Sequence, residues 1–209
     1  MVLFALFSEI EEAHIGKVYP PEPPFNAEQH VPVKIHSLKL EKYEPIRSLI
    51  ALPEVHLLQR VELPPATRYS VHFICTLLEA ARSHLRHVGV DMDNRDMVIF
   101  PQDARHNIRA ILRPITAAIA SLSVLESLSI LVTIHGSPKG PTKHFDLPCF
   151  HGATYDFVVN TIRSLPPSVR IVTFLLHIER KDRKRNFPSR SVLAPMAKDW
   201  SNLDDALAV

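Results

Sequence analysis

A short strand pattern that occurs five times along the chain constrains its fold more than any other feature. Each copy has an apolar residue, two variable residues, a second apolar residue, one variable residue and a third apolar residue. The five copies occupy residues 35–40, 58–63, 85–90, 125–130 and 169–174. Because alternate side chains of an extended strand share one face, the last two apolar residues of each copy point the same way. The pattern therefore predicts five strands, each with one buried side and one side of mostly polar or small residues.

Apolar residues at helical spacing lie between these segments and predict helices there. Ser70, Asn107 and Thr154 each precede such a run and are expected to cap the helices that follow. Pro114 lies inside the second run and is expected to kink or split that helix. A shorter helix is expected at residues 45–52, where proline stands in the first turn. Strands linked by helices on one side form a parallel sheet, so the sequence predicts an α/β fold of helix–strand repeats.

The proline content divides the chain into two regions. Residues 1–32 form a Pro-rich N-terminal segment, whereas residues 33–209 contain no stretch that resembles a domain linker and are expected to form one domain. Two long insertions interrupt that domain, at residues 137–150 and 179–198. The chain ends at Val209, just after a predicted helix that should lead to another strand, which is compatible with truncation of the domain at its C-terminus.

The spacing of the strand pattern resembles that of leucine-rich repeats, which have 20–29 residues built on Leu-x-x-Leu-x-Leu. The first two intervals between copies, 23 and 27 residues, fall in this range, whereas the next two, 40 and 44 residues, need insertions. The asparagine that usually follows the pattern is replaced in all five copies, by Tyr43, Ala66, Asp93, Thr133 and His177. We therefore expect an irregular leucine-rich-repeat-like solenoid with a parallel sheet.

The C-terminal third carries a second resemblance. Leu165-Pro-Pro-Ser-Val-Arg-Ile-Val-Thr-Phe174, followed by Trp200-Ser-Asn-Leu-Asp-Asp-Ala-Leu207, resembles basidiomycete fungal F-box/leucine-rich-repeat-like proteins. In that family an N-terminal F-box links the repeats to a cullin-type ubiquitin ligase, and the repeats recruit the substrate. Residues 1–32 contain no evident F-box, so the resemblance implies a ligase substrate adaptor only if an F-box is supplied elsewhere. By itself, the helical spacing around Trp200 predicts a core residue.

The solvent-facing side of the predicted strands is the candidate binding surface, because repeat proteins bind partners on surfaces that successive repeats build together. Six residues are expected to line it: Lys39, Arg60, Glu62, His87, Ser129 and Thr173. Their mixed polarity suits a protein partner better than a nucleic acid. The sequence thus favours a non-enzymatic protein-interaction scaffold.

Charge and hydropathy argue against two other kinds of partner. The formal net charge is only +2, so no overall field favours nucleic acid or an anionic membrane. No apolar run approaches the roughly 20 residues that a membrane span needs. The chain has five glycines and no Gly-rich phosphate-binding motif, and we expect no cofactor and no catalytic residue.

The alternative is a small α/β enzyme or metal-binding protein that uses a His/Cys loop at residues 135–151. This segment contains His135, His144, Cys149 and His151. Their spacing matches no standard zinc site, and solvated loop histidines are the simpler interpretation. A second candidate, Asp91–Asp96, lacks the glycine and distal glutamate of a calcium loop and is expected to be a polar turn.

Three further segments bear on location and assembly. The two cysteines are too few for a disulfide framework, which favours an intracellular protein, cytoplasmic or nuclear, with Cys75 as a small core residue. The basic run Arg180–Arg185 is either a nuclear import signal, a contact for an acidic partner, or a solvated loop. Ile171–Ile178 is apolar on both faces and would be an aggregation-prone outer strand. It needs a cover: the C-terminal helix, a self-association partner, or sequence beyond residue 209.

Overall fold

A computed structural model of the chain describes seven segments in which the helices and strands lie. The segments are residues 9–16, 34–50, 52–67, 69–93, 104–135, 147–179 and 198–203. The strands are β1 (Glu9–Ile15), β2 (Lys34–Leu40), β3 (Arg60–Glu62), β4 (His87–Asp93), β5 (Ser127–His135) and β6 (Ile171–Glu179). The α-helices are α1 (Glu44–Ile50), α2 (Val71–Ala81), α3 (Ala104–Ala120) and α4 (Leu147–Arg163), and a 3₁₀-helix, η3, spans Pro53–Leu57.

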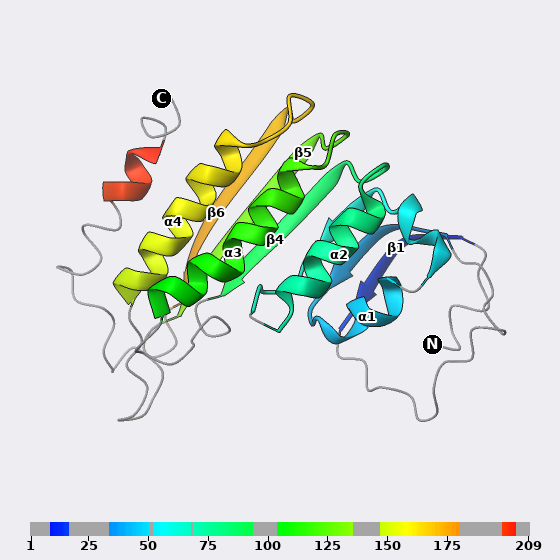
Figure 1. The fold of residues 1–209 in the computed structure, drawn as a ribbon, viewed down its shortest axis with the longest axis horizontal. Coiled ribbons are helices and arrows are strands. Elements are labelled where there is room, and N and C mark those ends of the chain that lie inside the picture. The colour runs from blue at the N-terminus through cyan, green and yellow to red at the C-terminus, as the bar shows by residue number, and fades with distance from the viewer. Residues whose placement is uncertain are drawn as a thin grey trace.

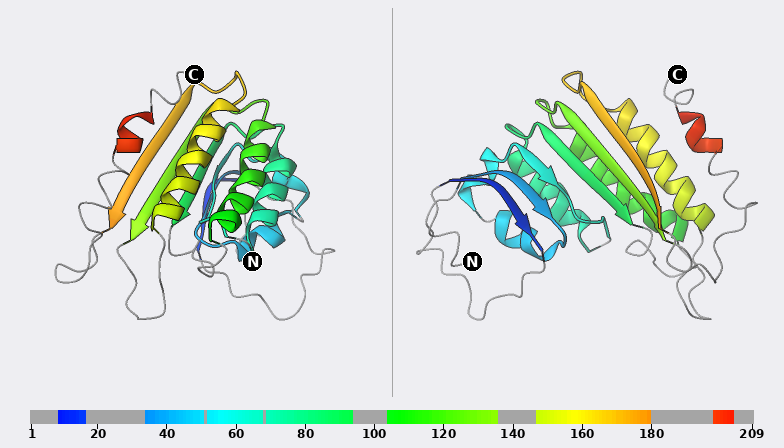
Figure 2. Two further views of the ribbon diagram at one scale, coloured as in Figure 1. Left: turned by 60° about the vertical axis from the view of Figure 1, so that its left-hand side comes forward. Right: turned by 180° about the vertical axis from the view of Figure 1, so that it is seen from behind.

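The six strands form one parallel sheet in which spatial order follows chain order, from β1 to β6. The helices lie in a single layer over one face of this sheet (Figure 1). The opposite face, which we call the open face, carries no helix in the described part of the chain (Figure 2). The structure therefore confirms the predicted α/β class and the parallel sheet.

The strand register follows the repeated pattern. Leu38 pairs with Val61, Val61 with Val88, Val88 with Leu128, and Leu128 with Val172. These are the second apolar residues of the five pattern copies, so all five predicted strands are present and in the expected alignment. In the second to fifth copies, the first apolar residue lies in the turn that enters the strand, whereas Ile35 of the first copy lies within β2 and pairs with Ile10. Leu58, Leu85 and Leu125 are buried in these turns, and Val169 is partly buried.

The core fills the space between the sheet and the helix layer. Apolar side chains from every strand up to β5 and from α1 to α4 join in one continuous cluster. Its fully buried large side chains include Leu38, Ile46, Ile74, Leu77, Leu78, Leu85, Met92, Leu112, Ile115 and Ile119. Cys75 is half-buried against this cluster, as expected for a small core residue, and burial raises the pKa of its thiol.

The start of α2 corrects the predicted cap. Ser70 makes no capping hydrogen bond as the N-cap residue. Instead, the backbone N–H of Ser70 donates to Thr67 Oγ1 at 3.1 Å, and the backbone N–H of Thr67 donates to Ser70 Oγ at 2.8 Å. This reciprocal pair is a capping box that starts at Thr67. The prediction was off by one turn because two hydroxyl residues stand three positions apart and each satisfies the other.

The longer helices also begin earlier than predicted. α3 starts at Ala104 rather than after Asn107, and it continues through Pro114 without a break. Pro114 is on the exposed side of the helix, while Ile115 and Ile119 are fully buried. Burial of that apolar side outweighs the backbone hydrogen bond that proline removes, because tertiary packing supplies most helix stability in proteins.

α4 begins at Leu147, seven residues before the predicted cap. Thr154 therefore lies inside the helix, where it is fully buried and its Oγ1 has no hydrogen-bond partner. Phe157 and Val158 face the core as predicted. The sequence signal was misleading because Pro148 and Gly152 lie in the first turns of α4, where they resemble a loop.

β1 is a strand that the repeated pattern did not predict, and it lies in the Pro-rich segment. Its sequence, Glu-Ile-Glu-Glu-Ala-His-Ile, buries only Ala13, opposite Leu38 of β2. At its start, the Glu9 carboxylate and His36 Nε2 form a 2.6 Å hydrogen bond. This bond and the charge of a protonated His36 lower the pKa of the exposed Glu9 carboxyl. Acidic residues masked the alternation from which the strand could have been predicted.

The C-terminal helical segment, residues 198–203, lies beside β6 and α4 (Figure 2). Trp200 stacks on Phe174 of β6 with ring centroids 4.6 Å apart and meets the edge of Tyr155 at 5.2 Å. Trp200 and Leu203 are partly buried against the core cluster. The predicted structural role of Trp200 is therefore confirmed.

Candidate functional site

The structure places all six candidate binding residues on the open face. The parallel register arranges them in two adjacent rows across the sheet. One row contains Arg60 opposite His87. The other contains Lys39 opposite Glu62 and, two strands further on, Ser129 opposite Thr173. The candidate site is therefore a continuous surface on strands β2 to β6.

The charged end of the open face is formed by three side chains on β2 and β3. Lys39 Nζ lies 3.1 Å from Glu62 Oε2, and Arg60 Nη2 lies 3.0 Å from Glu62 Oε1. Partial burial opposes ionisation of Glu62, but the hydrogen bonds and positive charges of Lys39 and Arg60 outweigh it and lower the pKa of this carboxyl. The trio carries one net positive charge and presents both donors and acceptors to a partner.

Gly89 of β4 gives the Glu62 side chain room on this surface. Gly89 stands opposite Glu62 in the register, between the charged trio and Ser129. A Cβ atom at position 89 would lie 3.3 Å from Glu62 Cγ, tighter than ordinary contact. The missing side chain lets the stem of Glu62 approach β4 closely while its carboxylate remains with Lys39 and Arg60.

In the two rows of candidate residues, the middle of the open face carries an imidazole and hydroxyl groups. His87 Nδ1 lies 2.8 Å from the Ser127 hydroxyl of the adjacent strand, and this contact fixes the imidazole across the sheet. Ser129 is half-buried, whereas Thr173 on β6 is exposed. These hydroxyl and imidazole groups can each donate and accept hydrogen bonds, which suits the recognition of polar groups on a partner.

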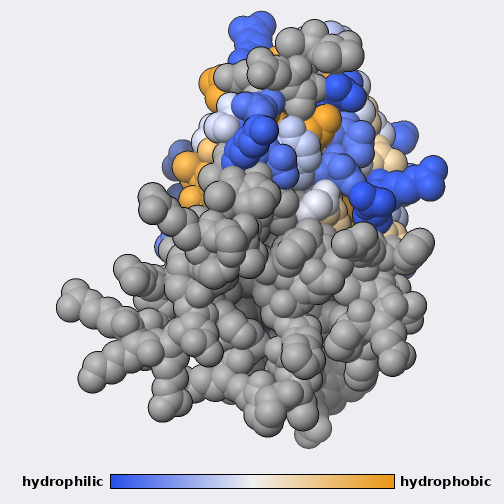
Figure 3. Space-filling model, turned by 90° about the vertical axis from the view of Figure 1, so that its left-hand side faces the viewer, coloured by the Kyte–Doolittle hydropathy of each residue, from blue (hydrophilic) through white to orange (hydrophobic). Residues whose placement is uncertain are grey.

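The apolar end of the open face lies on β6 and was not part of the predicted site. Ile171 and Leu175 flank Thr173 on the same face and are 61% and 53% exposed. Figure 3 views the molecule from this side and shows apolar surface next to hydrophilic residues. The sequence signal was present, because β6 is apolar on both faces, but it indicated an aggregation hazard rather than a binding surface.

Two further groups of residues extend the open face beyond the prediction. At one edge, His14 of β1 stands opposite Lys39 and contacts Glu41 Oε1 at 3.1 Å. At the carboxyl end, Asp91 and Asp93 belong to β4, and Asp93 pairs with Thr133 of β5. Asp93 is 6% exposed. The predicted polar turn at Asp91–Asp96 is therefore wrong for its first three residues, which continue the strand; residues 94–96 lie outside the described segments.

The proposed His/Cys loop is not a single loop. His135 is the last residue of β5, whereas Cys149 and His151 belong to α4. His144, like the basic run at residues 180–185, lies outside the described segments. Among the described residues, no three His, Cys, Asp or Glu side chains are grouped so that they could hold a metal ion.

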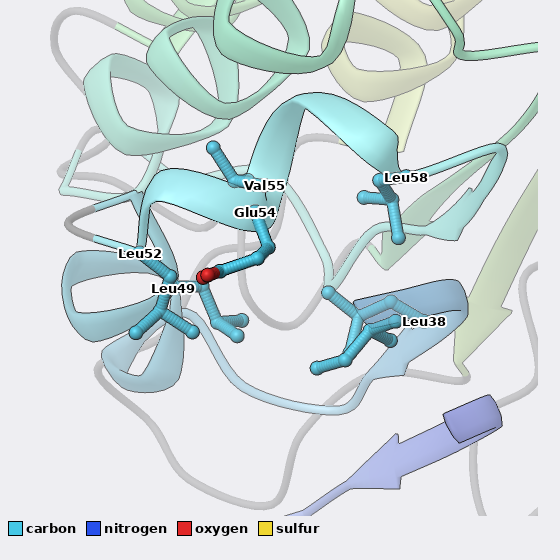
Figure 4. Close-up of a pocket in the computed structure, with 7 residues that line it drawn as sticks. Leu38, Leu49, Leu52, Glu54, Val55 and Leu58 are labelled. Carbon is cyan, nitrogen blue, oxygen red and sulfur yellow. The ribbon is translucent and has the colours of Figure 1, made fainter. Parts of the chain in front are cut away.

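An apolar pocket lies near the β2 end of the core, between β2, α1 and η3 (Figure 4). It encloses about 290 Å³, including space open to solvent. Leucine, isoleucine and valine side chains line it, together with a single acidic residue, Glu54. Small-molecule sites usually combine a larger volume with several converging polar groups, so this pocket is better understood as a packing gap.

Comparisons with known proteins give no family for this chain. No protein-family model, no curated protein and no solved structure matches it. Among the described helices, none has the length and apolar character required to cross a membrane.

Proposed function

We propose that this chain is a non-enzymatic protein-interaction scaffold that binds a protein partner on its open face. The observation that supports the proposal best is the continuous, in-register surface that runs from Lys39 to Thr173 across five parallel strands. A rigid sheet holds these side chains at fixed spacing, and repeat-built surfaces of this kind serve as recognition surfaces. The partner carries groups that complement a charged end, a polar middle and an apolar end.

The order of the strands supports an irregular leucine-rich-repeat-like solenoid as part of this proposal. Each strand pairs with the strand that follows it in the chain, and the intervening helices lie on one side. Stacked helix–strand units have this arrangement. The resemblance to F-box/leucine-rich-repeat-like proteins extends the proposal to an intracellular, cytoplasmic or nuclear, ubiquitin ligase substrate adaptor, provided that an F-box is supplied elsewhere.

The nature of the open face supports a protein partner over a nucleic acid. Lys39 and Arg60 are both ion-paired with Glu62, so the three side chains together carry a net charge of only +1. Recognition of a phosphate backbone relies on clustered basic side chains that are free to displace counterions. Protein interfaces instead combine apolar and polar contact residues, and the exposed Ile171 and Leu175 beside Thr173 supply both kinds.

Affinity capture from a cell extract, with mass spectrometry of the retained proteins, tests this proposal. The wild-type chain is compared with Thr173→Arg, which places a long charged side chain in the open face. Glu79→Arg introduces the same side chain at an exposed position of α2 and serves as the control. We expect a specific partner with the wild type and with Glu79→Arg, and at least a tenfold loss with Thr173→Arg, the size of one hot-spot contact. Equal capture by both variants would place the interaction elsewhere.

The identity of the retained proteins separates the two forms of the proposal. Recovery of a cullin together with its adaptor would support the ubiquitin ligase connection. Recovery of another partner, without cullin, would support a recognition module that acts alone. A folded chain that retains no specific protein would contradict the scaffold proposal.

A further inference from the structure

The outer edge of β6 is unpaired in the described part of the chain, where β5 is its sole neighbour. The N–H of Ile171 donates to the carbonyl of Glu126, so the backbone groups of Ile171 face β5. Because backbone direction alternates along a strand, the intervening residues Val172, Phe174 and Leu176 turn their N–H and C=O groups outward. Within the described residues these donors and acceptors have no strand partner, so this edge can pair with another strand.

Several apolar side chains of β6 are also exposed. Ile171, Val172, Leu175 and Leu176 are 61%, 40%, 53% and 37% exposed, and they make up four of the six large exposed apolar side chains in the described residues. On β5, the partners of Val172 and Leu176, which are Leu128 and Val132, are each only 1% exposed. The C-terminal segment covers part of the helix side through Trp200, but the exposures of Ile171 and Leu175 show that the open-face side remains bare.

The charges at the two edges of the sheet determine which strand can fill this position. No Lys, Arg, Asp or Glu occurs from residue 171 to residue 178, whereas the opposite edge strand, β1, carries Glu9, Glu11 and Glu12. Adding β1 of another copy to β6 would set acidic side chains against apolar ones and would build an open filament. Pairing β6 antiparallel with β6 about Leu175 sets Val172 opposite Ile178, Phe174 opposite Leu176 and Leu175 opposite itself, and it closes after two copies.

We propose that a second copy of this chain pairs its β6 antiparallel with β6, across a two-fold axis at Leu175. This register pairs all nine residues of the strand, so that Ile171 lies opposite Glu179 and Thr173 opposite His177. It also places the outward-facing backbone groups of Val172, Phe174 and Leu176 in the hydrogen-bonded positions. The inference concerns the edge of the sheet and does not rest on the function proposed for its open face.

The length of the contact between the two β6 strands, which we call the seam, indicates the expected affinity of the dimer. Nine residues at about 3.3 Å each give a seam of about 30 Å. A single strand edge of this length buries less than the roughly 800 Å² per partner of a standard interface. We therefore expect a reversible dimer with a dissociation constant on the order of micromolar.

Sedimentation equilibrium across a concentration series tests the dimer directly. Wild-type protein is expected to change from monomer to dimer as its concentration rises through the micromolar range. Leu175→Glu places two carboxylates side by side at the axis and is expected to remain monomeric at all concentrations. Val124→Glu makes a similar change at an exposed apolar residue outside the strands and is expected to dimerise like the wild type. A wild type that stays monomeric, or equal loss in both variants, would overturn the proposal.

Disulfide trapping tests the register. In a background with Cys75→Ser and Cys149→Ser, Leu175→Cys would face its own copy with Cα atoms about 4.5 Å apart, a separation that a disulfide spans. Ile171→Cys in the same strand would lie about 26 Å from its copy. We expect covalent dimers under mild oxidation for position 175 and none above background for position 171. Equal trapping at the two positions, or trapping at 171 alone, would overturn the pairing.

Discussion

The two ends of the sheet share one core pattern and differ on the open face. On β2 and β3, the open face carries Lys39, Arg60 and Glu62, which satisfy one another through ion pairs. On β6, it carries Ile171 and Leu175, which contact solvent. The helix side instead presents aligned apolar residues along the whole sheet. The difference shows that the repeated pattern constrains only the helix side and leaves the open face free to vary from strand to strand.

The strands at the two ends of the open face also differ in length. β3 has three residues, whereas β5 and β6 have nine each. A short edge-to-edge contact holds β2 to β3, while β5 and β6 pair along their full length. The charged end is therefore joined to the rest of the sheet through β3, the shortest of the described strands. The next prediction therefore tests whether the charged end and the apolar end unfold in one transition.

The largest expected effect is on stability, from two matched core substitutions at opposite ends. Leu38→Ala and Leu128→Ala each empty a site that is at most 2% exposed, and each should lower the free energy of unfolding by about 3 kcal/mol. Because both residues belong to one continuous cluster, each variant should unfold in a single transition. Urea denaturation followed by circular dichroism measures both quantities. Two separate transitions for Leu38→Ala would show that the charged end unfolds independently.

A smaller effect is expected at the cap of α2, which packs between the two ends. Thr67→Ala removes the hydroxyl that accepts the Ser70 backbone N–H and should cost about 1 kcal/mol. Thr67→Ser keeps the hydroxyl and should retain most of that stability. Thermal unfolding of the two variants measures the difference. Equal melting temperatures would contradict the reciprocal cap.

The ion-paired trio should contribute a still smaller, pH-dependent effect. Glu62 has a lowered pKa in the folded chain, so its ionised form favours folding above its ordinary value of 4.5, and this contribution is lost as the pH falls through the folded pKa. Glu62→Gln should therefore be less stable than wild type by about 0.5 kcal/mol at pH 7, since both partners are largely exposed. The gap should close in acid. Urea titrations at pH 7 and pH 3 measure it, and a constant gap would contradict the electrostatic origin.

The smallest effect is expected at the apolar end. Leu175→Ala removes a side chain that is 53% exposed and leaves no internal cavity. Its effect on unfolding should stay within about 0.5 kcal/mol when measured at a concentration too low for association. Urea denaturation at that concentration measures it. A loss as large as that of Leu128→Ala would show that β6 is covered within the monomer.

Local alternation explains why the strands could be predicted from the sequence while other elements could not. The register from Leu38 to Val172 follows from a spacing that is visible within six residues. The cap at Thr67 depends on which of two hydroxyls accepts which N–H, and the sequence does not rank them. β1 was missed because Glu11 and Glu12 interrupt its apolar alternation. The predicted kink at Pro114 is absent because this proline lies on the exposed side of α3, and that position depends on how the helix packs.

The candidate site shows the same division. The positions of Lys39, Arg60 and Glu62 on one face follow from the strand pattern alone. Their mutual ion pairs do not, because these depend on register between strands and on the space that Gly89 leaves for the Glu62 stem. The sequence predicts a loop at Cys149, whereas the structure has α4 there, because this helix begins with residues such as Pro148 and Gly152 that are uncommon in helix interiors. The strand pattern thus predicts which residues share the open face but not the contacts between them.

Because each strand pairs with its successor in the chain, the sheet fixes the spacing between side chains on neighbouring strands. Each additional helix–strand unit lengthens the sheet by one strand spacing, about 4.8 Å, without altering the pairs already made. The intervals between units range from 23 to 44 residues, yet the register from Leu38 to Val172 is uninterrupted. Insertions between units therefore change what surrounds the sheet while the distances along it stay the same.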